Sequence, residues 1–133
     1  MMAVSSHPLI AQYVAHHGIP EVIRSDGRAT VIIDDKYRVH MLGARNGWMA
    51  LSARLCMLPK TGVDRDRFLA EIGRQAAGML SSQPSSCVVD PGEEALWLQQ
   101  MVRPDADAVE VDEAVGDFAN ALSFWVNAVR RAA

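Results

Sequence analysis

The chain has 133 residues, half of them apolar and 22% charged, which is enough to build one domain around a continuous core. Thirteen Lys and Arg residues against sixteen Asp and Glu residues give a formal net charge of −3, which disfavours nucleic-acid binding because affinity for phosphate depends on clustered cations. No apolar run approaches the roughly 20 residues of a membrane span, and residues 1–7 lack the pattern of a signal peptide. We therefore expect one cytoplasmic domain over residues 1–133, with no membrane insertion.

A helix is predicted at the start of the chain, over about residues 6–17. Ser5 or Ser6 can cap its N-terminus, and Gly18 is a natural stop. Its apolar stripe repeats at helical spacing and consists of Leu9, Ile10, Tyr13, Val14 and His17.

Three strands are predicted next, over residues 29–34, 37–42 and 48–58. The connections between them are short, which favours an antiparallel meander. Strict alternation in the third strand would place on one face Met49, Leu51, Ala53, Leu55 and Met57. The opposite face would then carry Trp48, Ala50, Ser52, Arg54 and Cys56.

A second helix is predicted over residues 64–81, with Asp64 or Thr61 as its cap. Its apolar stripe is Phe68, Leu69, Ile72, Ala76 and Met79 or Leu80. A hairpin then follows, with strands at 87–90 and 94–102 around Pro91-Gly92. In its second strand, Leu96 and Leu98 would face one way, and the opposite way would face Trp97, Gln99 and Met101.

The last predicted helix covers residues 108–131. Asp107, with Glu110 three residues later, resembles a capping box. The helix has a continuous apolar stripe of Val111, Val115, Phe118, Leu122, Trp125 and Val129. The complete order α-β-β-β-α-β-β-α predicts an α+β domain in which three helices pack on a twisted antiparallel sheet.

Residues that carry chemistry do not form a known catalytic or metal motif. The histidines are His7, His16, His17 and His40, and no His-x-x-x-His or Glu-x-x-His spacing occurs among them. His16 and His17 are neighbours in a helix, so we expect them to point to different faces. Neither a Gly-x-Ser-x-Gly elbow nor a phosphate-binding glycine loop is present. We therefore predict no catalytic residues, no metal, no cofactor and no enzymatic activity, with a triad assembled in space as an open alternative.

The two cysteines, Cys56 and Cys87, are far apart in sequence. We interpret them as small buried apolar side chains, and a disulfide between them stays open.

Apolar residues on both faces of a strand indicate a protein that needs a partner. Seven methionines and three tryptophans are many for this length, and the segments at 48–58 and 94–102 carry apolar groups on both faces. One layer of helices covers only one face of a sheet, so the other face needs a second subunit or a client peptide. The alternative is that helices of the same chain cover both faces.

With these elements in place, residues 6–131 resemble the class I type III secretion chaperones, the family of the Tir and SycE chaperones. The resemblance lies in the order and spacing of four segments. These are the opening helix from Leu9-Ile10 to Gly18-Ile19, the strand GWMALSARL at 47–55 followed by Leu58-Pro59, the helix beginning near Phe68-Leu69 and leading to ALWL at 95–98, and the closing helix with Phe118, Ala121 and Trp125.

The resemblance implies a homodimer in the cytoplasm of a Gram-negative bacterium. Its function would be to bind the N-terminal segment of a secreted effector and to keep that segment soluble and competent for secretion. By position, the implied effector-binding residues are Ile10, Val14, Val31, Ile33 and Trp48. The implied dimer-interface residues are Leu80, Val88, Trp97 and Met101.

Three alternatives remain open at this point. A small regulatory or adaptor domain of the same fold would bind a partner that is not secreted. A small enzyme would require a pocket with convergent titratable groups. The second subunit of a dimer could also be a different chain.

Overall fold

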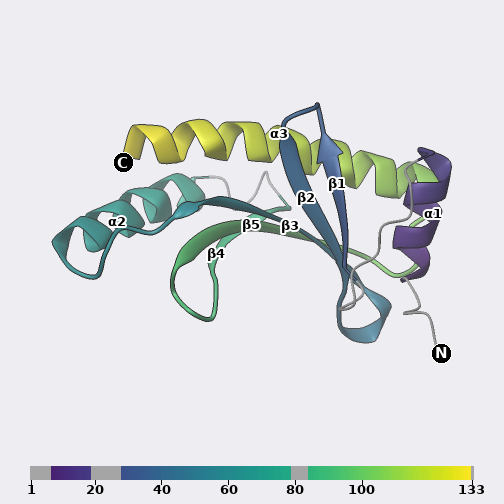
Figure 1. The fold of residues 1–133 in the computed structure, drawn as a ribbon, viewed down its shortest axis with the longest axis horizontal. Helices are drawn as coiled ribbons and strands as arrows, with labels where there is room; N and C mark the ends of the chain where they lie inside the picture. The colour runs from purple at the N-terminus through teal and green to yellow at the C-terminus, as the bar shows by residue number, and fades with distance from the viewer. Residues whose placement is uncertain (1–6, 19–27, 79–83, 133) are drawn as a thin grey trace.

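The predicted order of helices and strands is confirmed by the computed structural model, which describes residues 7–18, 28–78 and 84–132 (Figure 1). A short 3-10 turn, η1 (Arg45–Gly47), is the one element in these ranges that the sequence did not predict. The other elements are α1 (Pro8–His16), β1 (Ala29–Ile33), β2 (Tyr37–Gly43), β3 (Met49–Met57), α2 (Val63–Ala77), β4 (Ser86–Val89), β5 (Ala95–Val102) and α3 (Ala108–Ala132).

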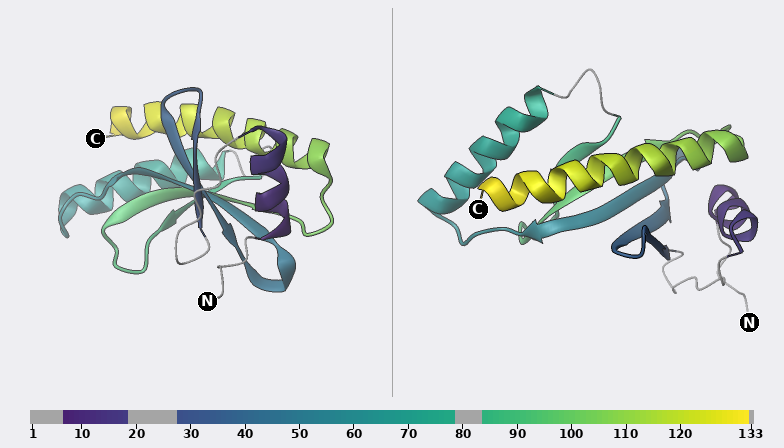
Figure 2. Two further views of the ribbon diagram at one scale, coloured as in Figure 1. Left: turned by 45° about the vertical axis from the view of Figure 1, so that its right-hand side comes forward. Right: turned by 90° about the horizontal axis from the view of Figure 1, so that it is seen from above.

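The five strands form one antiparallel sheet in the order β1-β2-β3-β5-β4. Helix α3 runs along one side of this sheet, with α1 near its N-terminal end and α2 near its C-terminal end (Figures 1 and 2). Both shorter helices contact α3. The helices therefore form a single layer, organised by α3.

The core lies between the sheet and α3. Every residue of the predicted α3 stripe, from Val111 to Val129, is buried, so this prediction is confirmed. In α1 the first four residues of the predicted stripe are buried as well, whereas His17 follows the helix as its C-cap and is exposed. The largest fully buried side chains come from α1, β2, β3, β5 and α3, and they are Ile10, Val39, Met41, Met49, Leu51, Leu96, Leu98, Val111, Phe118 and Leu122.

Strand β3 departs from the strict alternation that the sequence predicted. Its register against β5 shifts between Arg54 and Cys56, and Cys56 then pairs with the buried Leu96. A bulge adds one residue to a strand and so exchanges the two faces beyond it. As a result Cys56 packs against the core, and Met57, predicted to share a face with Leu51, is exposed.

The N-terminus of α1 is capped by His7, whereas the predicted caps Ser5 and Ser6 lie outside the described residues. The backbone N–H of Leu9 donates to His7 Nδ1 over 3.1 Å. His7 Nε2 lies 2.6 Å from the carbonyl oxygen of Gly47, which can only accept, so Nε2 carries the proton. One neutral imidazole thus caps α1 and also ties it to the turn between β2 and β3.

Helix α2 begins without a side-chain cap. Its N-cap residue is Gly62, at a φ of +140°, and not Asp64 or Thr61 as predicted. Asp64 and Asp66 lie in the first turn, where their charge favours the helix dipole. The helix ends at Ala77, and the predicted extension to residue 81 runs into residues outside the described ranges.

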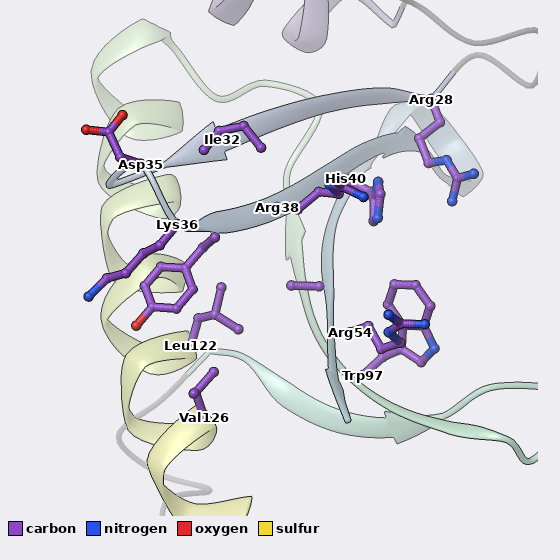
Figure 3. Close-up of a pocket in the computed structure, with 12 residues that line it drawn as sticks. Arg28, Ile32, Asp35, Lys36, Arg38, His40, Arg54, Trp97, Leu122 and Val126 are labelled. Carbon is purple, nitrogen blue, oxygen red and sulfur yellow. The ribbon is translucent and has the colours of Figure 1, made fainter. Parts of the chain in front are cut away.

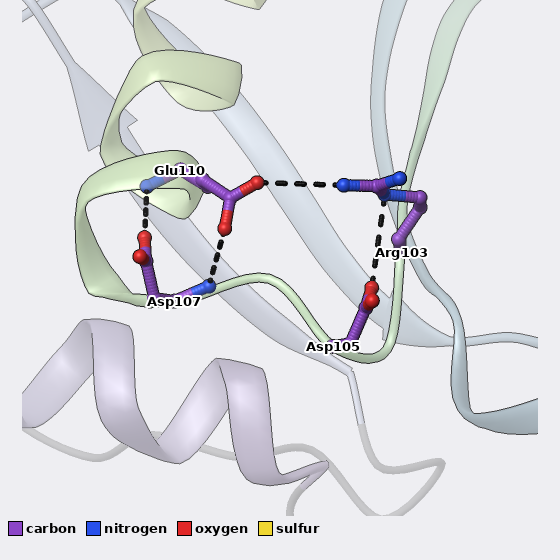
Figure 4. A network of polar contacts seen from close by, with 4 residues as sticks. All are labelled: Arg103, Asp105, Asp107 and Glu110. Carbon is purple, nitrogen blue, oxygen red and sulfur yellow. Dashed lines mark hydrogen bonds and ion pairs between the residues drawn. The ribbon is translucent and has the colours of Figure 1, made fainter.

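The predicted capping box of α3 is present (Figure 4). The N–H of Glu110 donates to Asp107 Oδ1 over 2.8 Å, and the N–H of Asp107 donates to Glu110 Oε1 over 3.2 Å. Arg103 reaches Glu110 at 3.5 Å and Asp105 at 3.7 Å, so the turn before α3 is joined to its first turn. These polar contacts fix where the central helix begins.

Because Asp107 satisfies an otherwise free N–H of α3, Asp107→Ala should lower the free energy of unfolding by about 1 kcal/mol. Urea denaturation monitored by circular dichroism measures this change. Asp117→Ala removes an exposed carboxylate from the middle of the same helix and should leave stability unchanged or slightly higher, because Ala is the better helix former. Equal losses in both variants would contradict the capping role.

Candidate protein-binding surface

The sheet face opposite α3 is not covered by any described helix. Paired residues of neighbouring strands point to the same side, so the register defines this face strand by strand. One row crosses the whole sheet through Thr30, His40, Ser52, Gln99 and Ser86. We call this side the open face, and its other residues are Ile32, Arg38, Leu42, Ala50, Arg54, Val88, Trp97 and Met101.

Large apolar side chains gather on the open face. Ile32 is 57% exposed, Leu42 40%, Val88 37% and Met101 42%. Trp97, which pairs with Val88, is partly buried, and its indole N–H has no acceptor among the described residues. Isolated exposed apolar residues are common, but a group of them on one sheet face is typical of an interaction surface.

A hollow opens where β2 separates from β3. The ladder between these strands runs from Gly43 paired with Met49 to His40 paired with Ser52 and ends there. Beyond this point the β1–β2 hairpin rises across α3 while β3 follows β5 (Figure 1). A space of about 600 Å³ lies between them, with Leu122 and Val126 of α3 on one side (Figure 3).

Among the charged residues that border the hollow, cations outnumber carboxylates. Arg28, Lys36, Arg38 and Arg54 line it, against the single carboxylate of Asp35. Trp97 and His40 lie on the same side, with their ring centroids 5.9 Å apart. The strand edges at its rim have backbone groups outside the β2–β3 ladder, so an extended segment could pair with them.

The structure places the predicted effector-binding residues mostly in the interior. Ile10, Val14 and Val31 are buried in the chain's own core, so they are not part of its accessible surface. Ile33 and Trp48 are partly buried. The exposed apolar residues on the same hairpin are Ile32, which lies between Val31 and Ile33, and Leu42. The two-residue period of β1 places Ile32 on the opposite side from Val31. It could have identified Ile32 as exposed once the side of β1 that faces the helices was known.

Three of the four predicted dimer-interface residues lie together on the open face. Val88 of β4 pairs directly with Trp97 of β5, and Met101 follows four residues later on the same strand. Leu80 lies outside the described residues.

Cys56 and Cys87 are free and partly buried. Burial, with a further contribution from Cys56, raises the pKa of Cys87 to about 12, and burial also raises the pKa of Cys56. Both thiols therefore remain protonated near neutral pH, which is unlike an activated nucleophile.

The two histidines at the end of α1, His16 and its C-cap His17, differ from the prediction. His16 and His17 were expected to point to different faces, but both reach Asp112 of α3. Their Nε2 atoms lie 3.7 and 2.7 Å from its carboxylate oxygens.

None of the described helices combines the length and hydropathy of a membrane span.

Comparison with known proteins gives matches among solved structures alone. No family model and no curated protein sequence matches the chain. A chain of the HopA1–SchA chaperone–effector complex superposes with a TM-score of 0.65 at 13% identity, over 90% of this chain and 91% of that one. The Yersinia pestis type III secretion chaperone SycH, in complex with a fragment of YscM2, gives 0.61 at 15% identity over 90% and 98%.

A third similar structure is the heterodimeric ExoU–SpcU complex from the type III secretion system of Pseudomonas aeruginosa. Its TM-score is 0.66 at 14% identity, over 90% of this chain and 96% of the matched chain. The matches cover nearly the whole length of both chains. At identities this low, they establish the fold alone. The chain therefore has the α+β fold seen in type III secretion chaperone complexes.

Proposed function

We propose that this protein is a type III secretion chaperone that binds the N-terminal segment of a secreted effector and keeps it soluble and ready for secretion. The observation that carries the proposal is the open face, an uncovered sheet surface with exposed apolar side chains, on a fold shared with chains of a chaperone–effector complex and of a type III secretion chaperone complex. The function is binding without turnover in the cytoplasm, and it uses no cofactor.

The client segment is proposed to contact the β1–β2 side of the open face. Ile32 and Leu42 supply apolar contacts there, and the neighbouring hollow offers strand edges. Ordering an extended segment costs free energy, so a chaperone needs a long contact with both apolar and backbone interactions. The cations at the hollow favour a client segment that carries acidic residues beside its apolar ones.

The opposite side of the open face is proposed to form a homodimer. Val88, Trp97 and Met101 form an apolar patch on β4 and β5 that a second copy can cover. In a two-fold dimer the same patch contributes from both subunits, so these apolar side chains would pack against their own copies. Ile32 lies on β1, at the opposite end of the strand order from β4, and stays free for the client, whereas Leu42 is separated from Met101 by Ala50 alone.

A charge placed in the dimer patch should separate the subunits. We expect wild type to have twice the chain mass at micromolar concentration, and Val88→Asp with Met101→Asp to be monomeric, because burying unpaired carboxylates opposes association. Multi-angle light scattering measures the mass. The control Val109→Asp changes an exposed valine of α3, away from the sheet, and should remain dimeric. A monomeric wild type would contradict the proposed dimer.

A charge at the client site should weaken client binding without affecting the dimer. We expect Ile32→Asp with Leu42→Asp to bind the N-terminal segment of the client effector at least about tenfold more weakly, measured by calorimetry. The control Val63→Asp alters an exposed valine of α2 and should bind like wild type.

Undiminished client binding by the Ile32 and Leu42 variant would contradict this site. Co-purification separates the proposed function from an adaptor role: we expect the chain to retain the effector segment. Selective retention of a regulator that is not secreted would instead support the adaptor.

A further inference from the structure

Three side chains that bind metal ions well in proteins converge where α1 meets α3. They are His16, the last residue of α1, His17, its C-cap, and Asp112 of α3. One ligand atom from each lies within 4.8 Å of the other two. His17 Nε2 is 2.7 Å from Asp112 Oδ1, and His16 Nε2 is 3.7 Å from Oδ2.

The end of α1 explains why neighbouring histidines reach the same carboxylate. Successive side chains within a helix point about 100° apart, but His17 lies beyond the last helical residue, with φ −95° and ψ 5°. Its ring packs on Tyr13 at a centroid distance of 4.3 Å and meets the His16 ring edge-on at 5.0 Å. The two imidazoles are thus held side by side, with both Nε2 atoms toward α3.

The ligand set and its spacing suit a late first-row divalent cation such as Zn²⁺. Two imidazole nitrogens with one carboxylate oxygen are a common zinc set, and bonds of about 2.0–2.1 Å place tetrahedral ligands about 3.3 Å apart. The two nitrogen–oxygen distances of 2.7 and 3.7 Å lie on either side of that value, and the three ligand atoms lie within 4.8 Å of one another, so the side chains must draw closer together to bind an ion. The negative end of the α1 dipole also favours a cation here.

The site is open enough to complete its coordination with water. The His16 side chain is 57% exposed, and those of His17 and Asp112 are each 39% exposed. We propose that His16, His17 and Asp112 form a divalent-cation site, occupied by Zn²⁺ or a similar ion, that fastens α1 to α3. This inference does not depend on the proposed chaperone function.

Such an ion would stabilise the folded chain from a position far from the open face. α1 contributes Ile10 and Val14 to the core, and its contact with α3 is the junction that the site spans. A ligand that binds the folded state and not the unfolded one raises the melting temperature in proportion to the logarithm of its concentration.

The test uses the full chain without an affinity tag, stripped with a chelator and titrated with zinc chloride in a calorimeter. We expect one Zn²⁺ per chain, and a rise in Tm of roughly 5 °C at saturating zinc. His17→Ala and Asp112→Ala should each weaken zinc binding at least about tenfold. The control Asp117→Ala, which removes another carboxylate of α3, should bind zinc like wild type.

Asp112→Asn distinguishes a metal site from a simple hydrogen bond between helices. The Asn side chain can still accept a hydrogen bond from His17, so the variant should melt like wild type in chelator, but it should lose the increase in Tm with zinc. Absence of zinc binding by wild type up to about 1 mM would overturn the proposal. Unchanged zinc affinity in Asp112→Asn and His17→Ala would overturn it as well.

Discussion

The packing of α3 against one face of the sheet is the contact on which the rest of the molecule depends. Its stripe from Val111 to Val129 buries the inner sides of the strands and receives α1 and α2 at its two ends. A helical layer that is complete on one side leaves the opposite sheet face to solvent or to a partner. The open face therefore follows from the packing of the helices on the other side of the sheet. Its exposed apolar residues make it suitable for binding a partner.

Two local irregularities shape that face. The β-bulge near Arg54 turns Cys56 inward and Met57 outward. The short ladder between β2 and β3 lets the first hairpin separate from the rest of the sheet. The hollow lies beyond the end of this ladder, and the open face carries exposed apolar residues on the first hairpin, Ile32 and Leu42, and on β4 and β5, Val88 and Met101. The proposed client and the proposed second subunit would both use this one sheet surface.

Features fixed by local chemistry were predictable from the sequence. The capping box of Asp107 and Glu110 and the stripe of α3 depend on residues a few positions apart, and both are present. The order of elements, and the side of β5 that carries Trp97 and Met101, follow from periods of 3.6 and two residues in the same way.

Features fixed by distant contacts were not predictable. The His7 cap depends on a carbonyl forty residues away, and the bulge depends on how β3 meets β5. The implied client contact Val31 is buried in the core whereas its neighbour Ile32 is exposed on the open face, and this difference depends on which side of β1 packs inward. Likewise, the local sequence of His16 and His17 does not indicate their contact with Asp112, because it is the packing of α1 against α3 that brings these residues together.

The central claim is that the open face, and not the outer surface of α3, receives the client. Hydrogen–deuterium exchange with and without a saturating client segment tests it most directly. We predict slower exchange at residues 37–39 of β2 and 53–57 of β3, where an added strand would pair with the free edges. Protection confined to α3, with β2 and β3 unchanged, would contradict the account.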